Sequence, residues 1–193
     1  MCPAAPRAPR ADGTRNREQL LEVATRVLAS PGAEASMRAI AREAGVGIAT
    51  LYRHFPTRES LVEAVYRDQV VRLTHGAREL LDTLAPAAAL RCWMDLFGNW
   101  IATKNGMLDT LLALVESGAV GHAGTRDELL NAISSILDAG RAAGELRPDI
   151  TAEEVATSLI GIFTVAPQAG PAVTADRLLD ILLDGLRPQV RCS

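Results

Sequence analysis

The segment from Ser36 to Arg58 places the tightest limits on how this chain can fold, because a glycine separates two short helical patterns and a proline ends the second. The first pattern has one apolar stripe at helical spacing, formed by Met37, Ile40, Ala41 and Ala44. Gly45 ends that helix, since glycine adopts left-handed backbone angles without strain. Pro56 ends the next helix because it has no amide hydrogen to donate. The segment therefore predicts a helix-turn-helix.

The second helix of this segment, from about Gly47 to Phe55, is short and two-sided. Leu51 and Phe55 lie four residues apart and are expected to face the core. Ile48 lies three residues before Leu51, so it is either part of that core or part of the outward side. In a helix-turn-helix one helix braces a second, which projects polar atoms into the major groove of DNA.

The residues from Gly45 to Phe55 read Gly-Val-Gly-Ile-Ala-Thr-Leu-Tyr-Arg-His-Phe. This stretch resembles the signature of the tetracycline-repressor-like (TetR) family: Gly-Val-Ser, two variable residues, Thr-Leu-Tyr, a variable residue and His-Phe. Arg58 stands where the family has a basic residue at the start of the following helix. Gly47 replaces the usual capping Ser, and Ala49 replaces a frequent Gly and adds a methyl group near the groove. The alternative to DNA binding is an ordinary helical hairpin within a bundle.

The resemblance implies that the chain binds double-stranded operator DNA. Side chains expected at base edges or thymine methyl groups are Ile48, Ala49, Thr50 and Arg53, and the last two can instead reach phosphates. Side chains that the resemblance places on phosphates are Tyr52, His54 and Arg58, together with Arg17 at the start of the first helix. Ser36, the expected N-cap of the first motif helix, and Gly47 complete the set of expected DNA-binding residues.

Charge is distributed unevenly along the chain, whose formal net charge is -3. Residues 1–60 carry nine Arg and six acidic residues, a net +3, whereas residues 61–193 carry eleven Lys and Arg and seventeen acidic residues, a net −6. The end that holds the motif therefore suits a phosphate surface better than the remainder does.

The remaining segments predict helices, with no strand-like alternation. The expected fold is all-α, with an N-terminal three-helix helix-turn-helix DNA-binding domain and a larger C-terminal helical domain for ligand binding and dimerisation. The expected divisions are a flexible tail over 1–14, the DNA-binding domain over 15–60, the effector-binding and dimerisation domain over 61–187, and a tail over 188–193. Arg7 and Arg10 in the first tail either touch DNA or are simply solvated.

The last two predicted helices are apolar on nearly every side, which is typical of a helix central to a fold or at a subunit interface. In the resembled family these helices pair with their copies to form the seam of a homodimer, and two half-sites on DNA also favour two copies. The expected interface residues are Val155, Leu159, Ile162, Phe163, Leu178, Leu179 and Leu182.

Large and adaptable side chains gather between positions 93 and 111. Such side chains line ligand cavities and equally form ordinary cores. By resemblance to the family, the expected effector pocket holds Trp93, Met94, Phe97, Trp100, Met107 and Leu111, and its effector would be small and largely apolar.

Catalytic, metal-binding and membrane-spanning patterns are not found. The three histidines and three cysteines have no metal-ligand spacing, and no phosphate-binding glycine loop or nucleophile elbow occurs. We expect neither enzymatic activity nor a cofactor, no membrane span, and a cytoplasmic location. The resulting hypothesis is a repressor that an effector releases from DNA, although activation is also open. The alternatives are a helical protein-interaction module or a ligand-metabolising protein on the same fold.

Overall fold

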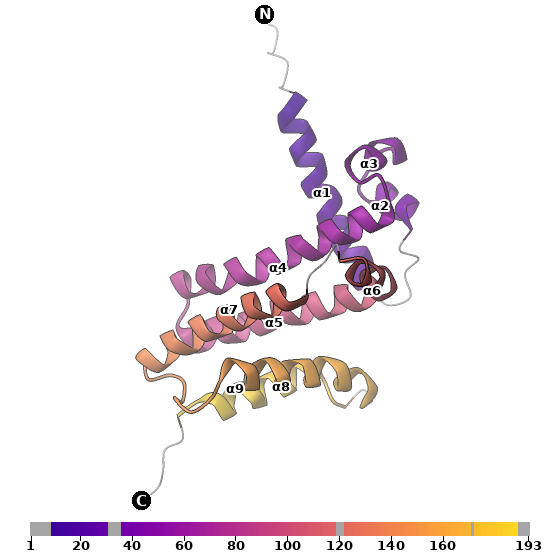
Figure 1. The fold of residues 1–193 in the computed structure, drawn as a ribbon. Helices are drawn as coiled ribbons and strands as arrows, with labels where there is room; N and C mark the ends of the chain where they lie inside the picture. Colours follow the sequence, from indigo (N-terminus) through magenta and orange to yellow (C-terminus); the bar gives the residue numbers. More distant parts are fainter. Residues whose placement is uncertain (1–8, 31–35, 119–121, 171, 189–193) are drawn as a thin grey trace, which may run out of the picture. The chain divides into compact units, whose positions relative to one another are not determined.

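The computed structural model describes residues 9–30, 36–118, 122–170 and 172–188, and within these ranges it contains helices and no β-strand (Figure 1). The expected all-α class is therefore confirmed. The helices are α1 (Pro9–Ala29), α2 (Met37–Glu43), α3 (Ile48–His54), α4 (Arg58–Thr83), α5 (Pro86–Gly106), α6 (Leu108–Glu116), α7 (His122–Ala142), α8 (Ala152–Val165), the short 3-10 helix η1 (Ala166–Gln168) and α9 (Ala175–Leu186).

The chain divides into two compact units. The first unit ends at Asp68 and also includes Ala102–Val120, whereas the second comprises Gln69–Ile101 and the chain from Gly121 onward. Helices α4 and α5 therefore each contribute to both units. The sequence-based division fell after residue 60 and placed α6 in the C-terminal domain. Hydrophobic periodicity does not reveal which helix packs on which, so it cannot locate a boundary that depends on this packing.

The core of the first unit is built around α1, α2 and α3. One apolar face of α1 is buried, and it comprises Leu20, Leu21, Ala24, Val27 and Leu28. The end of α5 approaches α1 so closely that a Cβ atom on Gly106 would lie 1.6 Å from the carbonyl oxygen of Leu28. A glycine is thus required where these two helices meet.

Two helices begin earlier than the sequence indicated. Helix α1 starts at Pro9 instead of Arg17, so Pro9–Thr14 are helical and not part of a tail. Proline suits the first turn of a helix, where an amide hydrogen is not needed. Helix α7 starts at His122, before Thr125-Arg126-Asp127-Glu128, a capping-box pattern that marks a helix start in the sequence. Both predictions relied on apolar periodicity or capping residues, which these first turns lack. Arg7 lies outside the described residues.

Side-chain caps open the last two helices of the second unit. A capping box opens α8: the Thr151 amide donates to Glu154 Oε2 at 2.7 Å, and the Glu154 amide donates to Thr151 Oγ1 at 3.2 Å. Thr174 caps α9 by accepting from the amide of Arg177. Helices α8 and α9 lie side by side (Figure 1), and α7 also packs on α8.

Candidate nucleic-acid interface

A tight turn after α2 sets the direction of α3. Ser36 caps the start of α2, because its hydroxyl oxygen accepts a hydrogen bond from an amide in the first turn at 3.2 Å. At the other end Gly45 has a φ of 67°. Its amide donates to the carbonyl of Arg42 at 3.1 Å, and the amide of Val46 donates to the carbonyl of Ala41 at 3.0 Å. This pair of bonds is a Schellman motif, in which a left-handed glycine satisfies the last carbonyls of the helix.

Helix α3 is held by its inner side. The amides of Thr50 and Leu51 donate to the carbonyl of Gly47 at 2.8 and 3.2 Å, so Gly47 caps the helix through its backbone alone. Leu51 is 0% exposed and Phe55 is 2% exposed. These two anchors fix the helix on the core and leave its opposite side to solvent.

The outward side of α3 carries five of the side chains expected to contact DNA. Ile48 is 37% exposed and Tyr52 is 46% exposed, and Ala49 and Arg53 are also exposed. Ile48 therefore belongs to the outward side and not to the core. Thr50 is half-buried, and its Oγ1 accepts a hydrogen bond of 3.4 Å from Nη2 of Arg53. These five side chains come together on a single short helix.

Further cations and hydrogen-bond donors flank α3. The guanidinium carbon of Arg17, on α1, lies 5.3 Å from the centroid of the Phe55 ring at the end of α3. His54 and Arg58 are half-buried on either side of Pro56. Glu59 follows Arg58 in the chain. Hydrogen bonds from the backbone amide of Glu59 and from the side chain of Thr57 lower the pKa of the Glu59 carboxyl.

The residues expected to line an effector pocket are all buried: Trp93, Met94, Phe97, Trp100, Met107 and Leu111. Ring centroids are 5.7 Å apart for Trp93 and Phe97 and 5.3 Å apart for Phe97 and Trp100, so the three rings pack as an aromatic core of the second unit. Met107 and Leu111 belong to the first unit. The alternative of ordinary core residues accounts for this packing.

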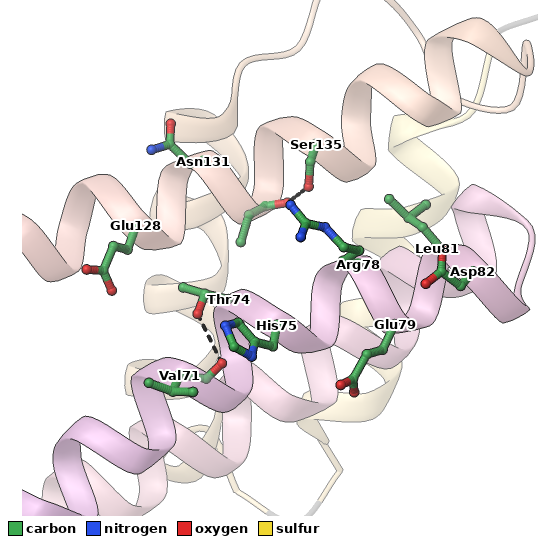
Figure 2. Close-up of a pocket in the computed structure, with 11 residues that line it drawn as sticks. Val71, Thr74, His75, Arg78, Glu79, Leu81, Asp82, Glu128, Asn131 and Ser135 are labelled. Atoms are coloured by element: carbon green, nitrogen blue, oxygen red, sulfur yellow. Dashed lines mark hydrogen bonds between the residues drawn. The ribbon is translucent and has the colours of Figure 1, made fainter.

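A half-open groove of about 730 Å³ lies in the second unit between α4 and α7, and we call it the α4–α7 groove (Figure 2). Its polar lining residues on α4 are Thr74, His75, Arg78, Glu79 and Asp82. Those on α7 are Glu128, Asn131 and Ser135, and Val71, Leu81 and Ala132 add apolar surface. None of the six residues expected in a pocket lines it. In the sequence, the groove is marked only by a polar face on each of the two helices. That pattern is also typical of a solvent-exposed helix surface.

The apolar residues expected at a subunit interface fall into two groups. Val155, Leu159 and Leu179 are at most 1% exposed, so they lie in the core of the chain itself and are not available to a partner. That part of the prediction requires correction. The half-buried remainder is Ile162, Phe163, Leu178 and Leu182. Periodicity could not separate the two groups, because α8 and α9 are apolar on several sides.

Three apolar side chains that the predicted interface omitted are well exposed on the last two helices. Ile160 and Val165 on α8 are 50% and 60% exposed, and Ile181 on α9 is 58% exposed. Gly161, beside Ile160, has no atom within 4 Å of an added Cβ. A contiguous exposed apolar patch marks an interaction site, whereas single exposed apolar side chains are normal on a protein surface.

Comparison with known proteins agrees with this geometry. Residues 20–65 match the family model described as bacterial regulatory proteins, tetR family. Residues 85–188 match the model described as transcriptional regulator SbtR-like, C-terminal domain. The chain belongs to the TetR family. It is a DNA-binding transcriptional regulator and not an enzyme, in keeping with that family.

Similar structures cover almost the entire chain. A TetR transcriptional regulator from Streptomyces coelicolor is 44% identical, with a TM-score of 0.81 over 90% of this chain and 99% of that one. A TetR regulator from Mycobacterium vanbaalenii is 34% identical, with a TM-score of 0.73 over 94% of this chain and 100% of that one. An HTH-type transcriptional regulator from Staphylococcus aureus is 38% identical over 68 residues, which are 34% of this chain and 37% of the length of that relative.

Within residues 9–30, 36–118, 122–170 and 172–188, no helix is both long and apolar enough to cross a bilayer. Among the same residues, no group of three or more His, Cys, Asp or Glu side chains is arranged to hold a metal ion.

Proposed function

We propose that this TetR-family regulator is a repressor that binds its operator as a homodimer and is released by a small-molecule effector. The observation that carries the proposal is the outward side of α3, where Ile48, Ala49 and Tyr52 are exposed while Leu51 is completely buried. An exposed apolar and aromatic side on a firmly anchored helix suits insertion into the major groove. Repression is the mode typical of the family.

In the proposed complex, α3 enters the major groove. Ile48 and Ala49 contact thymine methyl groups, while Thr50 and Arg53 reach base edges or adjacent phosphates. The hydrogen bond between Arg53 and Thr50 supports a shared role, because it orients the guanidinium along the helix.

Residues around α3 hold the phosphates on each side and fix the register of the helix. The cationic or hydrogen-bonding side chains assigned to this role are Arg17, Tyr52, His54 and Arg58. Ser36 retains a hydroxyl hydrogen for a phosphate, since its oxygen accepts the capping bond. Gly47 offers no side chain and allows the phosphate backbone to approach closely.

The proposed dimer seam consists of the exposed side of α8 and α9. It is centred on Ile160 and Ile181 and extends to the half-buried Ile162, Phe163, Leu178 and Leu182. In a dimer these residues would be covered by the same residues of a second copy, as two-fold symmetry requires. Two copies present two α3 helices, and a pair of half-sites then supplies the specificity that one short helix lacks.

Effector release follows if a bound ligand favours a conformation in which the two α3 helices no longer match the spacing of the half-sites. Helix α4 is suited to carry this signal, because it runs without interruption from Arg58, beside α3, to Thr83 in the second unit.

The test of this proposal is selection from a random duplex DNA library by the full chain. We expect a two-fold symmetric consensus, and binding that weakens with salt at a log–log slope of about −0.9 for each phosphate neutralised. Changing Ala49 to Gly or Ser should alter the preferred bases, whereas Tyr52→Phe should weaken binding to all duplex sequences alike. If the selected DNA shows no consensus and DNA binding does not change with salt concentration, a protein-interaction module is favoured instead.

A further inference from the structure

The α4–α7 groove is rich in hydrogen-bond acceptors. The Thr74 hydroxyl donates to the carbonyls of Val70 and Val71 at 3.1 and 3.0 Å. The Ser135 hydroxyl donates to the carbonyl of Ala132 at 2.8 Å. Each hydroxyl has one hydrogen, which is directed to its own helix, so each oxygen is left with lone pairs that can accept from a ligand.

Carboxylates add to these acceptors and make the groove acidic. Glu79, Asp82 and Glu128 line it against a single arginine, Arg78. These four charged side chains make no ion pair with the described residues, in contrast to Arg91 on the neighbouring helix, which is paired with three carboxylates. The groove therefore offers more negative charge than it neutralises internally.

The carboxylates lie toward opposite ends of the groove. Figure 2 shows Glu128 at one end and Asp82 at the other, with His75 and Arg78 between them. Along α4 the lining runs from Val71 to Asp82, which at 1.5 Å per residue corresponds to about 16 Å. A compact cation would reach only one end, whereas an extended molecule with several positive charges would reach both.

We propose that the α4–α7 groove binds an extended aliphatic polyamine, a ligand that consists of hydrogen-bond donors and positive charges along an apolar chain. Its terminal ammonium groups pair with Glu128 at one end and with Glu79 and Asp82 at the other. Its methylene groups pack on Val71 and Ala132. A polyamine differs from the largely apolar effector that the family resemblance suggested. The proposal rests on the proposed function only where ligand binding is linked to release of DNA.

The binding test uses isothermal titration calorimetry of the full chain with spermidine as the probe. The comparison compound is 1,8-octanediol, which has a similar chain length and no charge. We expect spermidine to bind and the diol not to bind. Comparable binding of the two compounds, or no binding of spermidine, would overturn the proposal.

Variants locate the site. The double variant Asp82→Asn with Glu128→Gln should lower the affinity for spermidine about fivefold or more, as expected for the loss of two exposed ion pairs. Arg78→Gln should raise the affinity, because it removes the arginine that opposes a cation. The matched control is Asp127→Asn, an exposed carboxylate beside Glu128 that does not line the groove and should bind spermidine as the original chain does. An equal loss in this control would show that the attraction is unspecific and would overturn the assignment.

The link to regulation is measured separately, by adding spermidine to the protein bound to its selected duplex. Because polyamines also bind DNA, only the difference between the original chain and the double variant counts. Greater release of the original chain supports the groove as the effector site, whereas equal release overturns that role. If the chain selects no DNA sequence at all, the proposed function fails while the calorimetric result stands by itself.

Discussion

The guanidinium carbon of Arg17 lies 5.3 Å from the centroid of the Phe55 ring, so a side chain of α1 is held beside the end of α3. Phe55 is 2% exposed and fixed in the core, whereas Arg17 is exposed. A cation–π contact at an exposed site contributes an interaction free energy of about 0.5–1 kcal/mol. The contact therefore orders a cation next to the proposed DNA-binding surface before any DNA arrives.

The first prediction concerns this cation. Arg17→Ala should weaken binding to all duplex sequences alike and reduce the log–log salt slope by about 0.9, the value for one phosphate. Arg26→Ala is the control, since Arg26 lies on the same helix and contacts Glu43 at 3.4 Å instead. A salt titration by fluorescence anisotropy measures both. A changed base preference with an unchanged slope would contradict a phosphate-binding role for Arg17.

The second prediction concerns the meeting of α5 with α1. An added Cβ on Gly106 would lie 1.6 Å from the Leu28 carbonyl oxygen, so one helix must move. Gly106→Ala should lower the free energy of unfolding by about 1–3 kcal/mol, as overpacking does. Gly124→Ala in α7 is the control, because nothing lies within 4 Å of its added Cβ. Urea denaturation should show unchanged or slightly raised stability for the control, and equal effects of the two substitutions would refute the close approach.

The third prediction concerns a cluster of charges that joins α5 to α9. The guanidinium of Arg91 donates to Asp180 and Asp176 at 2.8 Å each and to Asp95 at 2.5 Å. The hydrogen bond with Asp180 contributes most to raising the pKa of Arg91, which keeps it charged. Arg91→Gln would leave three carboxylates close together and should lower the free energy of unfolding by about 1–2 kcal/mol.

The control for this cluster is Arg126→Gln. Arg126 contacts Glu153 at 2.9 Å, and both side chains are about two-thirds exposed, at 64% and 65%. Exposed pairs contribute little, so thermal unfolding of the control should match that of the original chain. Added salt should restore part of the stability lost in Arg91→Gln, because it screens the repulsion among the carboxylates. No recovery with salt would contradict this explanation.

The fourth prediction concerns pH and the capping box of α8. Hydrogen bonds from the amide and the side chain of Thr151 lower the pKa of Glu154 below its ordinary value of 4.5. A carboxyl whose folded pKa is depressed stabilises the fold above its unfolded pKa, and the effect is lost as the pH falls through the folded value. Glu154→Gln keeps an acceptor for the cap but does not titrate there. Urea denaturation from about pH 5 to pH 3 should therefore show a smaller loss of stability in the variant than in the original chain, and parallel losses would contradict this assignment.

The sequence predicted the helix-turn-helix well because the forces that form it are local. Gly45 must adopt a positive φ, Ser36 must cap, and Leu51 and Phe55 must share one side of a short helix. Each requirement is visible within a few residues, and all were confirmed. Ile48 was the ambiguous position, since spacing alone allows either side, and only the packed structure shows that it is exposed.

The second unit was harder to predict because its helices are apolar on several sides. Leu159 and Ile160 are neighbours in the sequence, yet the first is 0% exposed and the second 50% exposed. Which side of α8 faces the core depends on the neighbouring helices, so the hydrophobic periodicity of α8 alone cannot predict it. The α4–α7 groove was missed for a related reason, since polar residues such as Glu128 and Asp82 have the pattern of a solvated helix face until two such faces are brought together.

The fifth prediction tests the proposed dimer seam. Ile160 and Ile181 are 50% and 58% exposed on α8 and α9. A carboxylate buried without a partner in an apolar interface is strongly unfavourable. Ile181→Asp should therefore shift the chain from dimer to monomer in analytical ultracentrifugation, and Ile160→Asp should do the same. Binding to a two-half-site operator should fall with the loss of the dimer, because a monomer presents only one α3 helix.

The control for the seam is Leu112→Asp. Leu112 on α6 is 49% exposed, close to the value for Ile160, but it lies outside α8 and α9. If any exposed apolar side chain could mediate association, this variant would dissociate as readily as the seam variants. We expect it to remain dimeric, because the area that two α8–α9 pairs bury against each other is unchanged. Dissociation of Leu112→Asp with retention of the Ile181→Asp dimer would place the interface on α6 and reject the proposed seam.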